Sequence, residues 1–311
     1  MTELTTTAAA EPASTDPATA PLLEIRDLGR KFGKLTAVAN LSFTMQAGEI
    51  YGFIGPNGAG KTTTMRILAT LDLPDTGDAL VAGRSVLIEP RAVREQVGFM
   101  PDEFRPYANL NVMEYLHFFA RAHGLKGEQR AAAVASAAEF CGLMSFSDRP
   151  TTGLSKGMGQ RLHLAKTLLH DPSLLILDEP ANGLDPRARI EFRELLRELK
   201  DAGKSILISS HILSELSETC DGVIVIEKGR EIVSGSIDAI AESMQGTHRA
   251  IRVRTLADSE AAVRFLLTQP HVERVEATAD RTVHLDFAGT DVELADLLRR
   301  TIEAKIALTG F

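Results

Sequence analysis

A glycine-rich run from Gly55 to Thr62 has the residue types and the spacing of a phosphate-binding loop. It reads Gly-Pro-Asn-Gly-Ala-Gly-Lys-Thr and fits G-x-x-x-x-G-K-[ST] between an apolar stretch and a helix-like one, the context that this pattern requires. Its glycines let backbone N–H groups close around a phosphate, and the helix N-terminus adds a positive dipole end. Lys61 would neutralise the β- and γ-phosphates, and Thr62 would offer a hydroxyl ligand to Mg²⁺. The run therefore predicts a nucleoside triphosphate site.

Two carboxylates follow an apolar run further along the chain. Leu174 to Leu177 has the length and composition of a buried strand, and Asp178 and Glu179 come directly after it. Ligands gather at the carboxyl ends of strands in open α/β sheets. We expect Asp178 to hold Mg²⁺, directly or through water, and Glu179 to act as the general base on a water, which typically contributes about 10²–10⁴-fold in rate. The alternative, two solvated carboxylates, loses weight beside a phosphate loop.

The segments around these residues predict an α/β fold. Helix-like segments separate the strand-like runs, which indicates a largely parallel core sheet across residues 22–245. Residues from about 102 to 165 lack β-alternation and include helical patterns at 112–123 and 128–140, so we expect a separate helical lobe there. The strand-like runs lie at 22–25, 37–45, 50–54, 174–177, 205–209 and 223–227.

Both ends of the chain differ from this middle part. Residues 1–21 are rich in Thr, Ala and Pro and predict a disordered tail. Residues 246–311 combine strand-like alternation with two helical patterns in the order βαββαβ, which predicts a small α+β domain of the ferredoxin-like type.

Composition excludes several classes of protein. The 311 residues carry a net charge of −8, and a pI near 5.6 argues against a dedicated nucleic-acid binder. No apolar run approaches the roughly 20 residues of a membrane-spanning helix, so a membrane role would need a partner. The two cysteines, Cys141 and Cys220, are too few for a disulfide framework.

Further motifs give the chain a family resemblance. Residues 154–158 read Leu-Ser-Lys-Gly-Met and resemble the signature motif of ATP-binding cassette (ABC) ATPases in its LSKGM variant. Residues 182–185, Asn-Gly-Leu-Asp, are similar to the family's D-loop, and His211 to its switch histidine. The match covers roughly residues 22–240 in the family's order. It implies a P-loop ABC-type ATPase fold with an α-helical signature lobe, ATP and Mg²⁺ as cofactors, and hydrolysis to ADP and phosphate.

The resemblance also implies roles for individual residues. Ser155 and the Gly157 amide would bind the γ-phosphate of an ATP held by the opposite subunit, which makes the active unit a head-to-tail dimer closed by two ATP molecules. His211 would sense that phosphate; alternatively, it is a histidine with a structural role only. Asp185 would link the two sites; alternatively, it only caps the N-terminus of the following helix. The catalytic residues would be Glu179 and His211, and the metal ligands Thr62, Asp178 and Asp102. The nucleotide-binding set would be Phe32, Gly55, Pro56, Asn57, Gly58, Ala59, Gly60, Lys61, Thr62, Thr63, Asp102, Ser155, Gly157, Asp178 and Asp185, in which Phe32 stacks on adenine or, alternatively, is a core aromatic.

Two departures from the family pattern lie close to this chemistry. Lys156 and Met158 stand where Gly and Gln are commoner, but Ser155 and Gly157 are retained, so we expect function to survive. Asp102 stands where the family usually has a Gln that reaches Mg²⁺ and the attacking water. Asp102 still offers oxygen, but its side chain is one methylene shorter and charged.

Residues 107–116 and the LSKGM variant look like those of ATPase subunits of ABC-2-type exporters. This likeness implies a separate integral membrane permease, a cytoplasmic position on the inner face of the membrane through that permease, and a homodimer or a heterodimer with a similar ATPase. We expect residues 104–111, with Phe104 and Tyr107, to dock the permease; the alternative is that these aromatics pack under their own lobe.

Other classes are weaker matches. Soluble ABC proteins of translation carry two cassettes, whereas this chain has one phosphate loop and one signature. DNA-associated relatives insert long coiled coils, and residues 62–173 show no sustained heptads. A regulatory module that binds ATP without turnover would not need Glu179 and His211.

Overall fold

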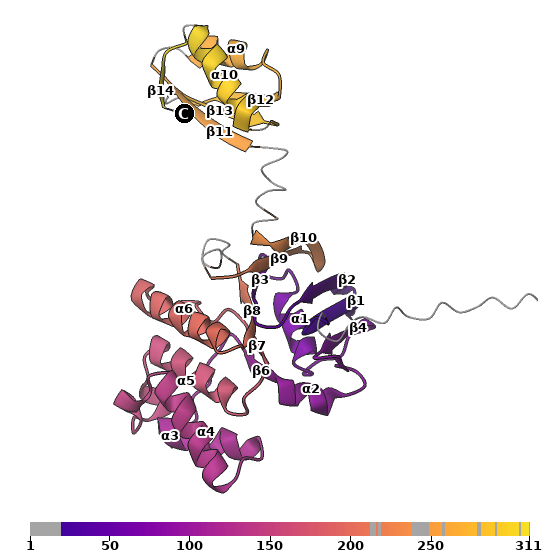
Figure 1. Ribbon diagram of the computed structural model, residues 1–311, viewed down its shortest axis with the longest axis vertical. Coiled ribbons are helices and arrows are strands. Elements are labelled where there is room, and N and C mark those ends of the chain that lie inside the picture. Colours follow the sequence, from indigo (N-terminus) through magenta and orange to yellow (C-terminus); the bar gives the residue numbers. More distant parts are fainter. Residues whose placement is uncertain are drawn as a thin grey trace, which may run out of the picture. The chain divides into compact units, whose positions relative to one another are not determined.

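The computed structural model describes residues 20–310 except 212–215, 217–218, 238–239, 241–248, 257–258, 279–280, 290 and 305. The tail expected at residues 1–21 therefore lies almost entirely outside the described residues. The chain divides into two compact units, Met1–Ser234 and Gly235–Phe311 (Figure 1), and each is described by itself.

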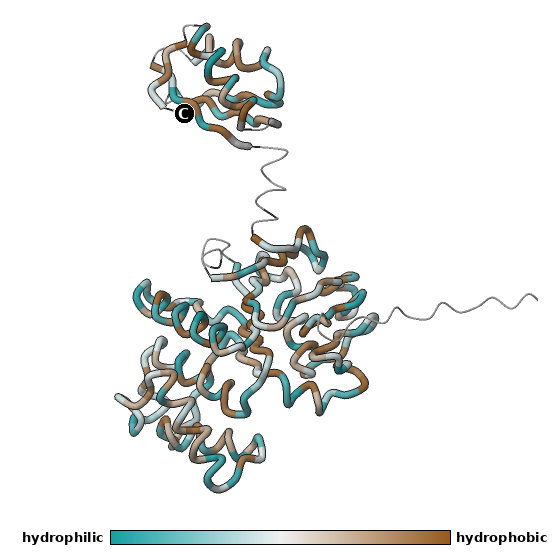
Figure 2. Tube along the Cα trace, in the orientation of Figure 1, coloured by the Kyte–Doolittle hydropathy of each residue, from teal (hydrophilic) through white to brown (hydrophobic). Residues whose placement is uncertain are grey.

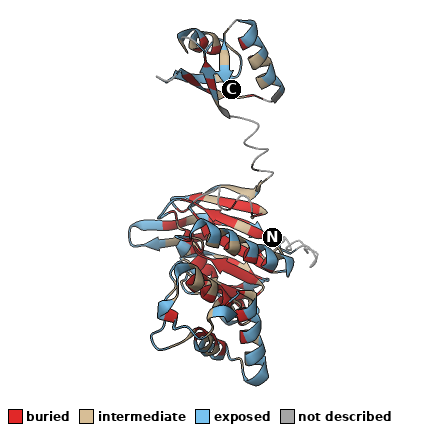
Figure 3. Cartoon of the chain, turned by 90° about the vertical axis from the view of Figure 1, so that its left-hand side faces the viewer, coloured by how far each residue is buried: buried red, intermediate tan, exposed pale blue. Residues whose placement is uncertain are grey.

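A six-stranded sheet forms the centre of the first unit. Its strand order is β10-β9-β3-β8-β7-β6, and the pairs from β9 through β6 are parallel. Every residue of β7 and β8 is buried, as parallel strands usually are, and Figure 3 shows the buried central strands in red. The strands are β3 (Ile50–Ile54), β6 (Val97–Met100), β7 (Leu174–Leu177), β8 (Ser205–Ser210), β9 (Gly222–Glu227) and β10 (Arg230–Ser236).

An antiparallel sheet of order β2-β1-β4-β5 completes the α/β part of this unit. Leu41, Phe43 and Met45 are buried while their neighbours in β2 are exposed, so alternate residues face the core. They join one hydrophobic cluster with Met65 and Leu68 of α1. The elements are β1 (Leu23–Phe32), β2 (Leu35–Met45), β4 (Thr76–Val81), β5 (Arg84–Ser85), α1 (Lys61–Leu68) and α2 (Pro90–Gln96).

The helical lobe lies between β6 and β7 in the chain. A capping box starts α3, because Asn111 Oδ1 accepts from the Glu114 backbone N–H at 2.8 Å and Glu114 Oε2 accepts from the Asn111 N–H at 2.9 Å. Figure 2 shows mixed hydropathy along these helices, which fits helices that bury only one face. The lobe contains α3 (Val112–Ala122), α4 (Gly127–Phe140), the short 3₁₀ turns η1 (Met144–Phe146) and η2 (Thr151–Gly153), and α5 (Lys156–Leu168); α6 (Pro186–Asp201) follows β7.

The second unit has the expected βαββαβ order and its own core. Its sheet order is β12-β13-β11-β14 with antiparallel pairs, and Val253, Leu285 and Phe287 are buried against Leu266 and Leu297 of its helices. The predicted fold class is thus confirmed. None of the helices in the described part of the chain is long and apolar enough to cross a membrane. The elements are β11 (Arg249–Thr255), α9 (Ser259–Leu266), β12 (Val272–Ala277), β13 (Thr282–Phe287), α10 (Asp291–Glu303) and β14 (Leu308–Gly310).

Candidate functional site

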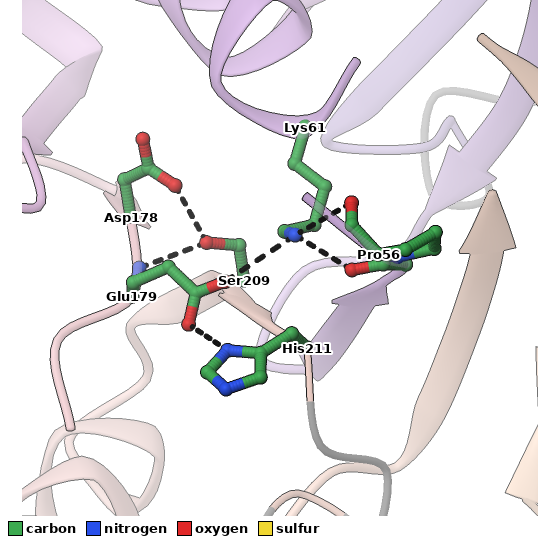
Figure 4. Close-up of polar contacts among 7 residues, drawn as sticks. Pro56, Lys61, Asp178, Glu179, Ser209 and His211 are labelled. Atoms are coloured by element: carbon green, nitrogen blue, oxygen red, sulfur yellow. Dashed lines mark hydrogen bonds and ion pairs between the residues drawn. The ribbon is translucent and has the colours of Figure 1, made fainter. Parts of the chain in front are cut away.

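The phosphate loop connects β3 to α1 and turns back on itself. Gly60 caps α1 with φ +106°, and a Cβ built there would lie 2.3 Å from the Ala37 carbonyl oxygen, so only glycine fits. Lys61 begins α1 and is 6% exposed. Its Nζ donates to the carbonyl oxygens of Gly55 at 2.7 Å and Pro56 at 3.4 Å (Figure 4), which holds the ammonium at the loop.

The acidic pair stands at the carboxyl end of β7, beside the parallel strand β8. Ser209 of β8 connects its two members, because its Oγ donates to Asp178 Oδ1 at 2.7 Å and accepts from the Glu179 N–H at 2.8 Å. Burial raises the pKa of Asp178 above its usual value; the hydrogen bond from Ser209 opposes the rise, and the charges of Asp102 and Glu179 add to it. Ser209 is a site residue that sequence reasoning missed.

Glu179 connects the phosphate loop to His211. Its Oε1 lies 3.3 Å from Lys61 Nζ and its Oε2 lies 3.0 Å from His211 Nδ1 (Figure 4). The Glu179 backbone has φ +46°, in the left-handed region that is costly for a residue with a side chain. Backbone strain of this kind persists only where the surrounding structure imposes it, and it gathers at functional sites. The carboxylate that sequence predicts as the base is therefore held between two cationic or polar partners.

A cavity of about 430 Å³ collects most of the predicted residues. Phe32 lies at the end of β1 and is 47% exposed, with the Arg30 guanidinium 4.8 Å from its ring centroid. The structure thus places an accessible aromatic ring and the phosphate loop in one cavity, the arrangement that a nucleotide requires. The lining residues are Phe32, Leu35, Ala37, Asn57, Gly58, Ala59, Gly60, Lys61, Thr62, Thr63, Asp102, Glu179, Asn182 and His211.

Ser155, Gly157 and Asp185 line a second pocket, of about 440 Å³, which we call the signature pocket. Gly55, Pro56 and Asp178, which were also predicted, are not among the lining residues of either cavity. Ser155 caps α5, its Oγ accepting from the Met158 N–H at 3.3 Å, and Asp185 caps α6, its Oδ1 accepting from the Ala188 N–H at 2.9 Å. The N-cap alternative for Asp185 is therefore present in the structure. None of the lining residues is shared with the nucleotide cavity. The signature pocket is lined by Gly142, Ser145, Phe146, Ser155, Lys156, Gly157, Met158, Arg161, Gly183, Leu184, Asp185, Ala188 and Glu191.

The predicted metal ligands have the chemistry that Mg²⁺ needs. Thr62, Asp178 and Asp102 offer oxygen atoms, the ligands that this hard cation prefers. Asp178 is fully buried, and its Oδ2 has no hydrogen-bond partner among the described residues, an arrangement that costs free energy unless a cation compensates it. These residues fit the metal.

Phe104 and Tyr107, the aromatic residues expected at a docking surface, differ in how far they are exposed. Phe104 is half-buried, with its ring centroid 5.8 Å from those of Tyr115 and His163, so it packs under its own lobe. Tyr107 also contacts Tyr115 at 5.8 Å, but it stays 45% exposed beside Phe118, which is 48% exposed. Only Tyr107 of these two keeps a surface available to a partner.

Comparisons with known proteins find family models, relatives and solved structures that resemble this chain. The family model described as "ABC transporter" matches residues 38–182, and one described as "AAA domain, putative AbiEii toxin, Type IV TA system" matches residues 148–217. Nod factor export ATP-binding protein I of Burkholderia lata is 42% identical over 224 residues, which cover 72% of this chain and 74% of that protein. Its namesake in Ralstonia nicotianae is 36% identical over 260 residues, 84% and 80% of the two chains. A solved structure titled "Structure of ATP binding subunit of ABC transporter" is 30% identical, with a TM-score of 0.65, and the match covers 72% of this chain and 93% of that one.

Proposed function

Since this chain belongs to the ABC transporter family of ATP-binding proteins, we propose that it hydrolyses ATP to power a membrane exporter of the ABC-2 type. The two curated relatives reported above both carry the name Nod factor export ATP-binding protein I. The chain itself would lie in the cytoplasm, bound to the inner face of the membrane through a separate permease subunit. The substrate path would then belong to the permease.

The division of the predicted residues between two pockets carries this proposal. One chain holds the phosphate loop and Glu179 in one cavity, and Ser155, Gly157 and Asp185 in another. Two copies placed head to tail would bring the signature pocket of each onto the nucleotide cavity of the other. Because one chain supplies both halves, we propose a homodimer that ATP closes.

The chemistry would rest on the contacts around Glu179. Mg²⁺, when bound, would supply positive charge beside the transferred phosphoryl group. A triphosphate entering the loop would compete with the Gly55 and Pro56 carbonyl oxygens and with Glu179 for the Lys61 ammonium. Glu179, released from Lys61 and oriented by His211, would then accept a proton from the attacking water.

Glu179→Gln tests the hydrolytic part of this proposal. We expect the variant to bind ATP, to lose about 10²–10⁴-fold in turnover, and to accumulate as an ATP-bound dimer. Phosphate release and sedimentation with ATP measure both effects. Glu198→Gln, an exposed carboxylate of α6, is the matched control and should hydrolyse ATP normally. Hydrolysis near the wild-type rate by Glu179→Gln would remove Glu179 from the base role.

The exposed pair Tyr107 and Phe118 is the surface that we propose for the permease. Their rings lie 5.8 Å apart on the helical lobe, and partly exposed aromatic side chains are typical anchors of interfaces. Tyr107→Ala should weaken co-purification with the permease while ATPase activity of the isolated chain persists. Ile302→Ala, a similarly exposed apolar residue of α10, should assemble normally. Normal assembly and transport by Tyr107→Ala would reject this surface.

A further inference from the structure

Lys156, the first residue of α5, places its side chain against the D-loop. A Cβ built on Gly183 would lie 2.1 Å from Nζ and 3.1 Å from Cε of Lys156. The end of the lysine side chain therefore occupies the space that a side chain at position 183 would take. Gly183 has φ +67°, a conformation that glycine adopts without strain. The signature and D-loop segments are thus in contact within one chain, and the ammonium of Lys156 lies where they meet.

The other charged residues of the signature pocket are already engaged. Arg161 donates to Glu191 at 2.6 Å and to the Cys141 carbonyl oxygen at 3.3 Å, and Glu191 also accepts from Arg187 at 2.9 Å. Asp185 caps α6. Lys156 is exposed and, among the residues that the structure describes, forms no hydrogen bond or ion pair. Within the described part of the chain it is a cation without an ion-pair partner, in a pocket that also presents the Ser155 hydroxyl and the N-terminus of α5.

We propose that Lys156 binds the triphosphate of the ATP held by the partner protomer and so acts as a second phosphate-binding cation beside Lys61. The proposal rests on the head-to-tail dimer proposed above. An ammonium is a compact point charge that suits a phosphate oxygen, and such charge-assisted bonds are about twice as strong as neutral ones. Lys156 would thereby stabilise the closed, ATP-bound dimer and leave ATP binding by a single chain unchanged.

The experiment uses the full chain with Glu179→Gln as background, so that ATP is not consumed. Lys156→Met keeps most of the side-chain stem and removes the charge, whereas Lys156→Arg keeps a positive charge. Sedimentation at increasing protein concentration with saturating ATP gives the dimer dissociation constant of each variant. A fluorescent ATP analogue, at a protein dilution where the chain is monomeric, gives the affinity of one chain for nucleotide.

We expect Lys156→Met to weaken the dimer about 100-fold, from roughly 10-fold at each of two equivalent sites. Lys156→Arg should recover most of this loss. Added salt should weaken the dimer of the Glu179→Gln chain more than the dimer of the chain that carries both Glu179→Gln and Lys156→Met. The affinity of the monomer for the ATP analogue should not change, because Lys156 does not line the nucleotide cavity.

Three results would overturn the proposal. An unchanged dimer dissociation constant in Lys156→Met would show that the ammonium contributes nothing. A loss in Lys156→Ala that Lys156→Met does not share would assign the effect to the stem packed on Gly183. A Glu179→Gln chain that binds ATP but never dimerises would remove the proposed dimer and this role together, whereas the first two results leave the dimer standing.

Discussion

Ser209→Ala should be the most informative single change in the nucleotide site. The hydroxyl donates to Asp178 Oδ1 at 2.7 Å and accepts from the Glu179 N–H at 2.8 Å, and Ser209 is 1% exposed. Its removal leaves one oxygen of a fully buried carboxylate without this donor and one backbone N–H without its acceptor. Both losses occur where water has little access.

The expected cost follows from these two bonds. A hydrogen bond to a charged group is worth about 1.5–3 kcal/mol, and an unsatisfied buried N–H costs about 1–3 kcal/mol. The two terms share one oxygen atom and are not additive, so we expect Ser209→Ala to lower the free energy of unfolding by about 2–4 kcal/mol at neutral pH.

This loss should depend on pH. Because burial raises the folded-state pKa of Asp178 above the usual 3.8, the folded state retains this proton to a higher pH than the unfolded state does. The resulting stability is fully present below pH 3.8 and is lost as the pH rises through the folded-state pKa. The Ser209 hydrogen bond lowers that pKa, so its removal raises the pKa further. The deficit of Ser209→Ala should therefore grow from acid toward neutral pH.

Urea unfolding followed by circular dichroism at a series of pH values measures this deficit. Ser205→Ala is the matched control, since Ser205 is equally buried in β8 but its Oγ accepts from the Gly48 N–H at 2.7 Å and contacts no carboxylate among the described residues. Its deficit should stay constant with pH. A Ser209→Ala deficit that is below about 1 kcal/mol, or that is as flat with pH as the control, would refute the reasoning.

Three further outcomes are expected. Gly60→Ala should abolish ATP binding in calorimetry, because the new Cβ would lie 2.3 Å from the Ala37 oxygen; retained affinity would contradict this tight approach of the loop to β2. Phe32→Ala should weaken ATP binding about 5–150-fold, the equivalent of about 1–3 kcal/mol of stacking, and leave tripolyphosphate binding unchanged; equal losses for both ligands would reject stacking. Deleting residues 246–311 should leave a folded chain that binds ATP, since the second unit has its own core; a folded truncation without nucleotide binding would contradict this division.

The fold was predictable where local patterns and tertiary structure agree. Continuous apolar runs mark β7 and β9, and alternation marks β2 and β13, so these strands are evident from the sequence. The first strand was predicted to span residues 22–25, but β1 continues to Phe32. Its pairing with β2 shifts register between Ile25 and Leu28 and again before Lys31, and Asp27 has φ +49°. Such bulges break the alternation from which a strand is recognised.

The candidate site was predictable in its residue types but not in its contacts. The phosphate-loop motif around Lys61 and the carboxylates directly after β7 can be predicted as site residues from their spacing in the sequence. Ser209 does not, because its relation to Asp178 arises from the parallel pairing of β7 with β8, which no local pattern specifies. The only available signal was its position at the end of a predicted strand, two residues before His211. The roles of the individual residues stay predictions.

The ion pair between Lys61 and Glu179 has a consequence for how ATP affinities are measured. In the absence of nucleotide, the carboxylate at 3.3 Å competes with any incoming phosphate for the same ammonium. Glu179→Gln removes that competitor as well as the base. The trapped variant should therefore hold ATP more tightly than the wild-type chain does, and an affinity measured on it overstates the native one. Affinities of other variants are comparable only within one background at position 179.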